Sequence, residues 1–272
     1  MPIKLIAVDM DGTFLNDEKT YNIGRFVQIF RRMQSQGIRF VVASDNQYFQ
    51  LRSFFPEDYQ KISFVAENGA NIVIGDLPFY HEKINTALVK KTLRLFEEKI
   101  HPQHYVIGGE KSAYISDNVP DNVFSYASFY NPRIKRLADI REVINEKDDL
   151  FKFALNFKEE EAADKLKQLA QHLGGALIAV SSGHGDVDLI LPDVNKFTGL
   201  CRLGKEWGIS KDEMMAFGDS GNDFEMIKGV KYGVVMENGQ PALKSVAWKV
   251  IPSNNTEALL DMIEQVLDGQ IS

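Results

Sequence analysis

Four short apolar runs, each ending in polar residues, constrain the fold of this chain more than any other feature. They read KLIAV at 4–8, RFVVA at 39–43, ISFVA at 62–66 and MMAF at 214–217. Continuous apolar runs of this length are typical of strands buried on both faces, as in a parallel sheet. Helical periodicity lies between them, at 22–36 and 196–207, and a glycine follows each helix. The alternation predicts a doubly wound, Rossmann-like α/β core.

The middle of the chain has a different pattern. Its expected elements are a hairpin around Gly108-Gly109 in 104–116, a half-exposed strand at 151–157, an amphipathic helix at 159–173, and strands at 176–182 and 186–191. This is α+β composition between two halves of an α/β core. We therefore expect a core of residues 1–83 and 187–272 and an inserted α+β domain of residues 84–186.

Two carboxylates follow the first apolar run, in Asp9-Met10-Asp11-Gly12-Thr13. Residues spaced by two at a strand end project to the same side, so one can attack while the other transfers protons. Gly12 allows a tight turn away from the strand. Acidic turn residues are common after strands, so this motif alone leaves a structural role open.

A second acidic loop, Gly218-Asp219-Ser220-Gly221-Asn222-Asp223, follows the last apolar run. Ligands of doubly wound sheets bind at the carboxyl ends of the strands, where both acidic loops would lie. Crowding the two pairs of aspartates there without a cation would be strongly unfavourable, and hard oxygen ligands suit Mg²⁺. Ser44 follows the second run and can donate to a phosphate oxygen. Lys196 begins a helix, where backbone amides also favour anions.

These four segments resemble the four motifs of the haloacid dehalogenase-like phosphatases, and the insert resembles the large cap of the Cof-type subfamily. The resemblance implies that Asp9 attacks phosphorus and forms an aspartyl-phosphate, while Asp11 acts as general acid and then general base. It also implies that Mg²⁺ is held by Asp9, the backbone carbonyl of Asp11, and Asp219, and that Asp223 supports the metal or orients Lys196. The residues expected at the phosphate or substrate are Ser44, Asp45, Asn46, Lys196 and Asn222.

Two positions depart from the pattern of that family. Asp45 stands where the second motif usually has glycine, so an inward-pointing carboxylate would repel a phosphorylated substrate. An outward-pointing carboxylate would matter little. Phe197 stands where glycine often follows the lysine, and its place on the apolar helix face predicts a core residue.

Three functions remain open at this point. The first is hydrolysis of a small phosphomonoester, expected to be a sugar phosphate. The second is a phosphomutase, which would need a second phosphate site in the insert; the candidates are Lys111, Arg133, Lys135 and Arg136. The third is a phospholigand-binding protein whose turnover Asp45 has impaired. The identity of the leaving group is open in every case.

Several weaker candidates lie outside the motifs. Four aromatic residues of the insert favour a core role over a pocket role: Phe124, Tyr126, Phe129 and Tyr130. His184 lies near the expected hinge, and a loop role is favoured. Asn68 resembles a family feature but fits a turn almost as well. Cys201 is predicted to be a buried thiol in a helix.

Composition bounds the partners and the compartment. The 272 residues include 31 basic and 38 acidic side chains, a net charge of −7, which argues against duplex nucleic acid as a partner. No apolar stretch approaches the roughly 20 residues that a membrane helix needs. The single cysteine excludes an intrachain disulfide and fits a reducing compartment. The apolar run at 4–8 is too short and too acidic for a signal peptide, so we expect the cytoplasm. The oligomeric state is open.

Overall fold

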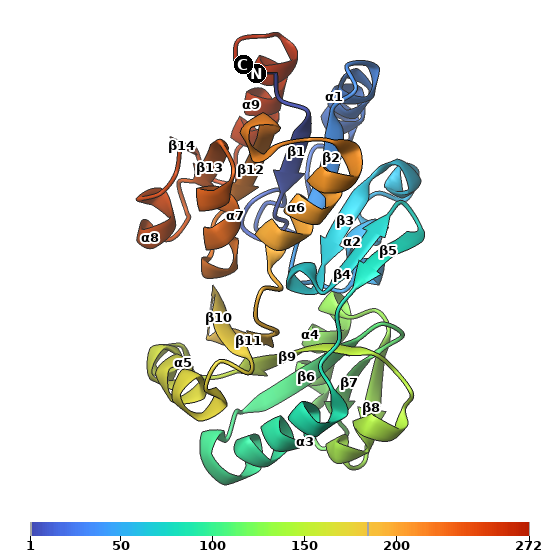
Figure 1. The fold of residues 1–272 in the computed structure, drawn as a ribbon, viewed down its shortest axis with the longest axis vertical. Helices are drawn as coiled ribbons and strands as arrows, with labels where there is room; N and C mark the ends of the chain where they lie inside the picture. Colours follow the sequence, from blue (N-terminus) through green and yellow to red (C-terminus); the bar gives the residue numbers. More distant parts are fainter. Residues whose placement is uncertain (1, 184, 272) are drawn as a thin grey trace.

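The computed structural model describes residues 2–183 and 185–271. They form two sheets that lie one beyond the other along the long axis of the molecule (Figure 1). The first is an eight-stranded sheet in the order β14-β13-β12-β1-β2-β3-β4-β5, parallel from β14 to β3, with β4 and β5 antiparallel. Its strands are β1 (Leu5–Val8), β2 (Arg39–Ala43), β3 (Ser63–Ala66), β4 (Asn71–Ile74), β5 (Leu77–His81), β12 (Met214–Gly218), β13 (Tyr232–Met236) and β14 (Lys249–Ile251).

Helices cover both faces of this sheet. On one face lie α1 (Ile23–Ser35), α2 (Tyr48–Ser53) and α9 (Ala258–Leu267); on the other lie α6 (Lys196–Trp207), α7 (Phe224–Gly229) and α8 (Pro241–Lys244). Alternate residues of β1 enter the two cores, Ile6 on the α1 side and Leu5 on the α6 side. Such two-sided burial explains why the strands read as unbroken apolar runs. The predicted doubly wound α/β core is confirmed.

The second sheet is inserted between β5 and α6 and has six strands in the order β10-β11-β9-β6-β7-β8. The strands are β6 (His104–Gly109), β7 (Ala113–Ser116), β8 (Ile134–Leu137), β9 (Leu150–Asn156), β10 (Ile178–Gly183) and β11 (Asp186–Ile190). All pairs are antiparallel except β7 with β8. The second segment of the core was predicted to begin at residue 187. This residue lies within β11, which pairs with β9 in the inserted sheet.

Three longer helices accompany the inserted sheet. α3 (Thr86–Leu95), continued by a π-helical turn at Phe96–Ile100, and α5 (Glu159–Leu173) pack on one face, whereas α4 (Asp121–Tyr130) covers part of the other. Short 3₁₀ turns lie at Tyr59–Lys61, Glu67–Gly69, Ile140–Asn145, Lys211–Glu213 and Gly221–Asp223. No helix among the described residues is long and apolar enough to cross a membrane.

Two local predictions were wrong. The β6–β7 hairpin turns at residues 110–112, not at Gly108-Gly109, which lie inside β6. A Cβ at Gly108 would lie 3.0 Å from Glu67 Oε2, so this glycine permits close approach of the two sheets. Cys201 is exposed rather than buried, because the apolar face of α6 passes through Leu200 and Leu203. Phe197 packs against the core, as predicted. His184 lies outside the described residues.

The chain crosses between the two sheets twice, after β5 and after β11. A small apolar cluster marks these crossings: Ala70 from the turn after β3, Phe151 from β9, and Val194 from the return segment are all buried in it. The backbone N–H of Ile84 also donates to the Leu150 carbonyl. Both crossings are therefore anchored at one place.

Candidate active site

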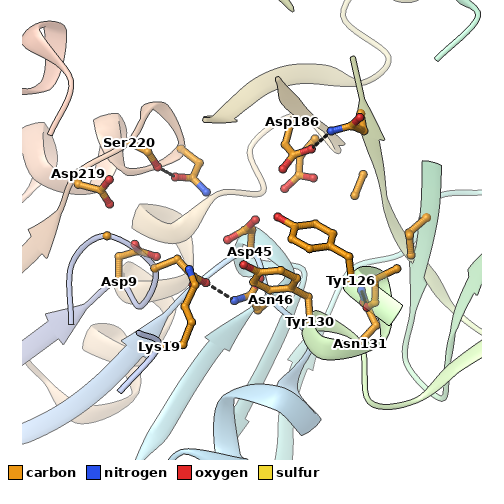
Figure 2. A pocket seen from close by; sticks show the side chains of 18 of the residues that line it. Asp9, Lys19, Asp45, Asn46, Tyr126, Tyr130, Asn131, Asp186, Asp219 and Ser220 are labelled. Carbon is orange, nitrogen blue, oxygen red and sulfur yellow. Dashed lines mark hydrogen bonds and ion pairs between the residues drawn. The ribbon is translucent and has the colours of Figure 1, made fainter. Parts of the chain in front are cut away.

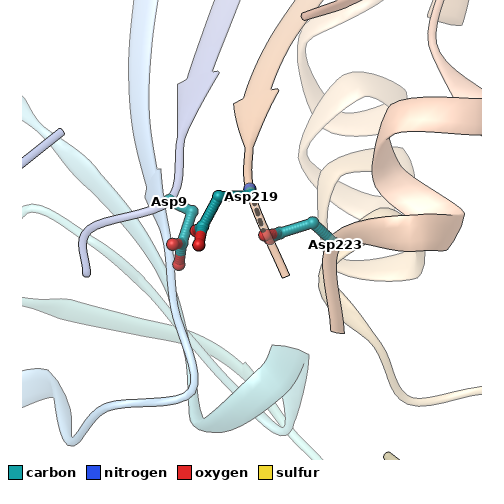
Figure 3. Close-up of side chains that lie close together, drawn as sticks. All are labelled: Asp9, Asp219 and Asp223. Carbon is teal, nitrogen blue, oxygen red and sulfur yellow. Dashed lines mark hydrogen bonds between the residues drawn. The ribbon is translucent and has the colours of Figure 1, made fainter. Parts of the chain in front are cut away.

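The neighbouring strands β1 and β12 bring the two acidic loops together. Val8 pairs with Phe217 in the parallel register, so Asp9 and Asp219 emerge from adjacent strand ends. Carboxylate oxygens of Asp9, Asp219 and Asp223 all lie within 4.8 Å of one another (Figure 3). The cluster that the sheet-edge rule predicted is therefore present for these three residues.

Lys196 bridges two members of this acidic cluster. Asn195 caps α6 by accepting a hydrogen bond from the Thr198 N–H at 2.9 Å, which fixes where the helix begins. Lys196 Nζ donates to Asp9 Oδ1 and to Asp223 Oδ1, both at 2.7 Å, and its side chain is fully buried. Lys196, which the order of the motifs suggested, therefore contacts the predicted nucleophile Asp9.

Asp223 is held in a closed loop. Its Oδ2 accepts hydrogen bonds from the backbone N–H groups of Asp219 at 3.0 Å and Ser220 at 3.1 Å. A Cβ at Gly218 would lie 2.6 Å from Asp223 Cγ, so glycine is required there. With Lys196 on its other oxygen, Asp223 fixes both the lysine and the Asp219 backbone.

Burial makes the negative charge of this cluster costly. Burial raises the pKa of Asp9 well above its ordinary value; Lys196 opposes the rise, and Asp223 and Asp219 add to it. Burial and the Asp223 charge likewise raise the pKa of Asp219 to about 7, although Thr13 donates to its Oδ1 at 2.9 Å. Burial alone would lower the pKa of Lys196, but Asp223 and Asp9 outweigh it and raise that pKa. Three carboxylates against one ammonium leave an excess of negative charge on hard oxygen ligands, which fits a magnesium ion.

Asp11 does not belong to this group of three carboxylates. Its Oδ2 accepts from Asn46 Nδ2 at 2.7 Å, and its Oδ1 pairs with Lys19 Nζ. Asn46, expected at the phosphate, therefore contacts the expected acid/base. Lys19 was missed by sequence reasoning, because nothing in the pattern of its turn reveals the left-handed backbone (φ 58°) that places it there.

The remaining motif residues lie around the same strand ends. Ser44 is fully buried, and its Oγ accepts from the Asn46 N–H at 3.1 Å. Asn222 donates through Nδ2 to Asn68 Oδ1 at 3.3 Å, and Asn68 in turn donates to Asp188 of β11 at 2.6 Å. Asn68 thus connects the second acidic loop to the inserted sheet.

A cavity of about 610 Å³ lies between these motif residues and the inserted sheet (Figure 2). Even-numbered positions of three paired strands form one wall: His104, Val106 and Gly108 of β6, Lys152, Ala154 and Asn156 of β9, and Asp186 and Asp188 of β11. Tyr126 and Tyr130 of α4 also line it, with ring centroids 5.1 Å apart. The predicted core role is therefore wrong for Tyr126, whose side chain is 56% exposed. Phe124, a residue of α4, packs against the apolar cluster between this helix and its sheet, as predicted. The core role is also wrong for Phe129, which is exposed, and Tyr130 lines the cavity.

Asp45 points into this cavity. It is one of the lining residues, and Figure 2 shows its carboxylate in the space between the core loops and the two tyrosines. The inward orientation considered from the sequence is the one found.

A buried lysine joins the inserted sheet to the core beside Asp45. Lys152 Nζ donates to the Asp45 carbonyl at 2.6 Å and lies 3.2 Å from Asp188 and 3.6 Å from Glu67. The sequence did carry a signal for it. In 151–157 the odd positions are apolar and Lys152 and Asn156 are polar, which marks one face of the strand as polar.

Comparison with known proteins agrees with this fold and site. Residues 6–263 match the family model described as haloacid dehalogenase-like hydrolase. The chain belongs to that family. It is 42% identical over 270 residues to the Escherichia coli 5-amino-6-(5-phospho-D-ribitylamino)uracil phosphatase YbjI, covering 98% of this chain and 97% of that one. It is 27% identical to a phosphoglycolate phosphatase of Sulfolobus acidocaldarius, covering 99% of each.

The solved structure of SMU.1108c from Streptococcus mutans superposes with a TM-score of 0.92 at 34% identity, covering 98% of this chain and 99% of that one. Both parts of the molecule are therefore shared with that protein. The chain is a phosphoric monoester hydrolase of the haloacid dehalogenase-like family, as the sequence predicted.

Proposed function

We propose that this phosphatase hydrolyses a small phosphorylated metabolite with the help of Mg²⁺ and uses Asp9 as its nucleophile. The observation that carries the proposal is the position of Lys196, whose ammonium bridges Asp9 and Asp223 beside Asp219. A cation held there favours the ionised form of Asp9 and can also hold a phosphoryl oxygen.

Two steps follow from this assignment. In the first, an Asp9 oxygen attacks phosphorus, the ester P–O bond breaks, and Asp11 gives its proton to the leaving oxygen. In the second, Asp11 takes a proton from water, and the oxygen of that water attacks the phosphorus of the aspartyl-phosphate. Phosphate leaves and Asp9 is regenerated. Asn46 and Lys19, which contact Asp11, would orient its carboxyl group.

Magnesium would be held by Asp9, Asp219 and the backbone carbonyl of Asp11. When bound, it supplies the positive charge that offsets repulsion between an anionic nucleophile and an anionic ester. Asp223 would act through Lys196 and the Asp219 backbone. Ser44 and Asn222 would bind phosphoryl oxygens with Lys196. Asn46 would contribute through Asp11.

The inserted domain, predicted as residues 84–186, would act as a cap that encloses the substrate. We propose a phosphorylated sugar or sugar alcohol, and the first compound to try is the ribityl phosphate ester named for the E. coli relative. The four basic residues considered for a mutase give that alternative no support, since none of Lys111, Arg133, Lys135 and Arg136 lines the cavity.

The test is release of phosphate from p-nitrophenyl phosphate and a panel of sugar phosphates, with Mg²⁺ or with EDTA. We expect metal-dependent release by the native chain, loss of release in Asp9→Asn, and unchanged release in the exposed control Asp212→Asn. A native chain that is inert while Asp45→Gly releases phosphate would favour the impaired binding protein. Equal release by native chain and Asp9→Asn would overturn the nucleophile assignment.

A further inference from the structure

The charges on the cavity walls point to the class of leaving group. We propose that Asp45 is a specificity residue, which admits leaving groups that are uncharged or cationic and excludes those with a second anionic group. This inference rests on the proposed phosphatase function of the same site.

Asp45 is held where a leaving group must pass. It follows the buried Ser44 at the end of β2, and its carboxylate lies between the core loops and α4 (Figure 2). Its carbonyl accepts from Lys152 at 2.6 Å, and Ser44 Oγ lies 3.4 Å from its Oδ1. Lys152 is itself buried, so this contact fixes the Asp45 backbone from the side of the inserted sheet.

The cationic side chains that line the cavity are already engaged. The basic residues among the described lining residues are Lys19, Lys152 and His104, and none is an arginine. Lys19 pairs with Asp11, and Lys152 pairs with Asp188 and Glu67. Burial lowers the pKa of His104, which disfavours its cationic form. A second anion on the leaving group would therefore meet Asp45 without a new cationic partner.

The acidic groups outnumber these cations on the leaving-group side. Asp186 and Glu159 line the inserted-domain wall in addition to Asp45, and Asp188 of the same wall is buried against Lys152. Hydroxyl and ammonium groups can donate to such carboxylates, whereas a carboxylate or phosphate is repelled by them. The rings of Tyr126 and Tyr130 offer a surface against which a carbon skeleton can pack. A polyol or an amino alcohol has both the donors for the carboxylates and the carbon skeleton for the tyrosine rings.

A matched pair of esters tests the proposal directly. D-Glucitol 6-phosphate and 6-phosphogluconate share one hydroxylated six-carbon chain and differ in a terminal CH₂OH or carboxylate. We expect kcat/KM of the native chain to be about tenfold or more higher for the glucitol ester, because a like charge in the cavity is disfavoured. Asp45→Asn should narrow this ratio, mainly by lowering KM for 6-phosphogluconate. The exposed control Asp164→Asn should keep it.

Binding separates this proposal from the proposed function. Calorimetric affinities of both esters for the Asp9→Asn variant with Mg²⁺ need no turnover and should show the same preference. A native chain that releases no phosphate from any ester would overturn the proposed function, yet the affinity ratio would still decide the role of Asp45. Equal affinities and equal kcat/KM for the two esters would overturn the proposal. So would a preference that Asp45→Asn and Asp45→Gly, both folded by circular dichroism, leave unchanged.

Discussion

The turn after β3 contains three consecutive residues with positive φ: Glu67 at 51°, Asn68 at 56° and Gly69 at 98°. The left-handed region costs a non-glycine residue on the order of 1–2 kcal/mol. Here the cost is offset by contacts, since Asn68 binds both Asn222 and Asp188. The sequence showed Asn68 as a turn residue, but its partners lie 154 and 120 residues away and no local pattern reveals them.

Gly69 of this turn has no room for a side chain. A Cβ there would lie 2.4 Å from the Asn195 carbonyl oxygen, whereas a Cβ at Gly37, also at positive φ (72°), would meet nothing within 4 Å. We expect Gly69→Ala to lower the free energy of unfolding by roughly 1–3 kcal/mol more than Gly37→Ala, because it adds a backbone clash to the conformational cost. Urea denaturation measures both.

The Gly69 change should also affect activity. Asn195 caps the helix that begins with Lys196, so displacing it moves the lysine away from Asp9. Gly69→Ala should lower kcat and Gly37→Ala should not. Equal losses of unfolding free energy in the two variants would contradict the clash between a Cβ at Gly69 and the Asn195 carbonyl.

The raised pKa of Glu67 should make the stability of the fold depend on pH. Burial raises its pKa to about 7 from 4.5, although Lys152 opposes the rise. The folded protein therefore holds this proton more tightly than the unfolded chain does. The stability that the protonated group contributes is fully present below pH 4.5 and is lost as the pH rises through about 7.

The Glu67→Gln variant keeps a neutral side chain at every pH. Its free energy of unfolding relative to the native chain should therefore increase between pH 5 and pH 8, by on the order of 3 kcal/mol. Denaturation at the two pH values measures this. The exposed control Glu57→Gln should show no such trend, and a flat difference for Glu67→Gln would contradict the raised pKa.

At the scale of elements, the sequence predicted what depends on local pattern. The apolar runs locate β1, β2, β3 and β12 to within one residue at each end, and the helical period locates α6 at both ends. The same strand ends bring Asp9, Asp219 and Asp223 together, because neighbouring parallel strands share an edge. These parts of the fold and of the site were predictable.

The cavity wall was not predictable in the same way. The alternation in 151–157 marks a polar face of β9 but does not say what that face meets, which depends on pairing with β6 and β11. Tyr126 is exposed because it lines the cavity and does not belong to the apolar cluster under α4. Contacts between distant elements decide both features.

The ion pairs of Lys152 in β9 with Glu67 and Asp188 should contribute to stability. Lys152→Met would leave Glu67 and Asp188 buried without their cation, so we expect a loss of about 3–5 kcal/mol in the free energy of unfolding. Chemical denaturation of this variant and of the exposed control Lys90→Met tests the difference. A Lys152→Met variant as stable as the control would show that the buried pair contributes nothing.

At the scale of the whole molecule, metal binding should stabilise the fold. Mg²⁺ that binds the folded chain alone at about 100 times its dissociation constant adds about 2.7 kcal/mol. Relief of the repulsion among Asp9, Asp219 and Asp223 is the physical source. We expect Mg²⁺ to raise Tm by several degrees and EDTA to reverse the rise. Asp219→Asn should lose this response and Asp212→Asn should keep it; a native chain without the response would contradict the metal site.

The anchoring of both chain crossings at Ala70, Phe151 and Val194 has a consequence for how such enzymes diverge. An insert that departs and returns at one place can change its inward-facing strand positions without altering the order of the core strands. The core carries Asp9, Lys196 and Asp219, whereas the wall above them comes from β6, β9 and β11. Substitutions in this wall can therefore reshape the cavity while Asp9, Lys196 and Asp219 stay in place. The exceptions are Lys152 and Asp188, which bind Asp45 and Asn68 of the core.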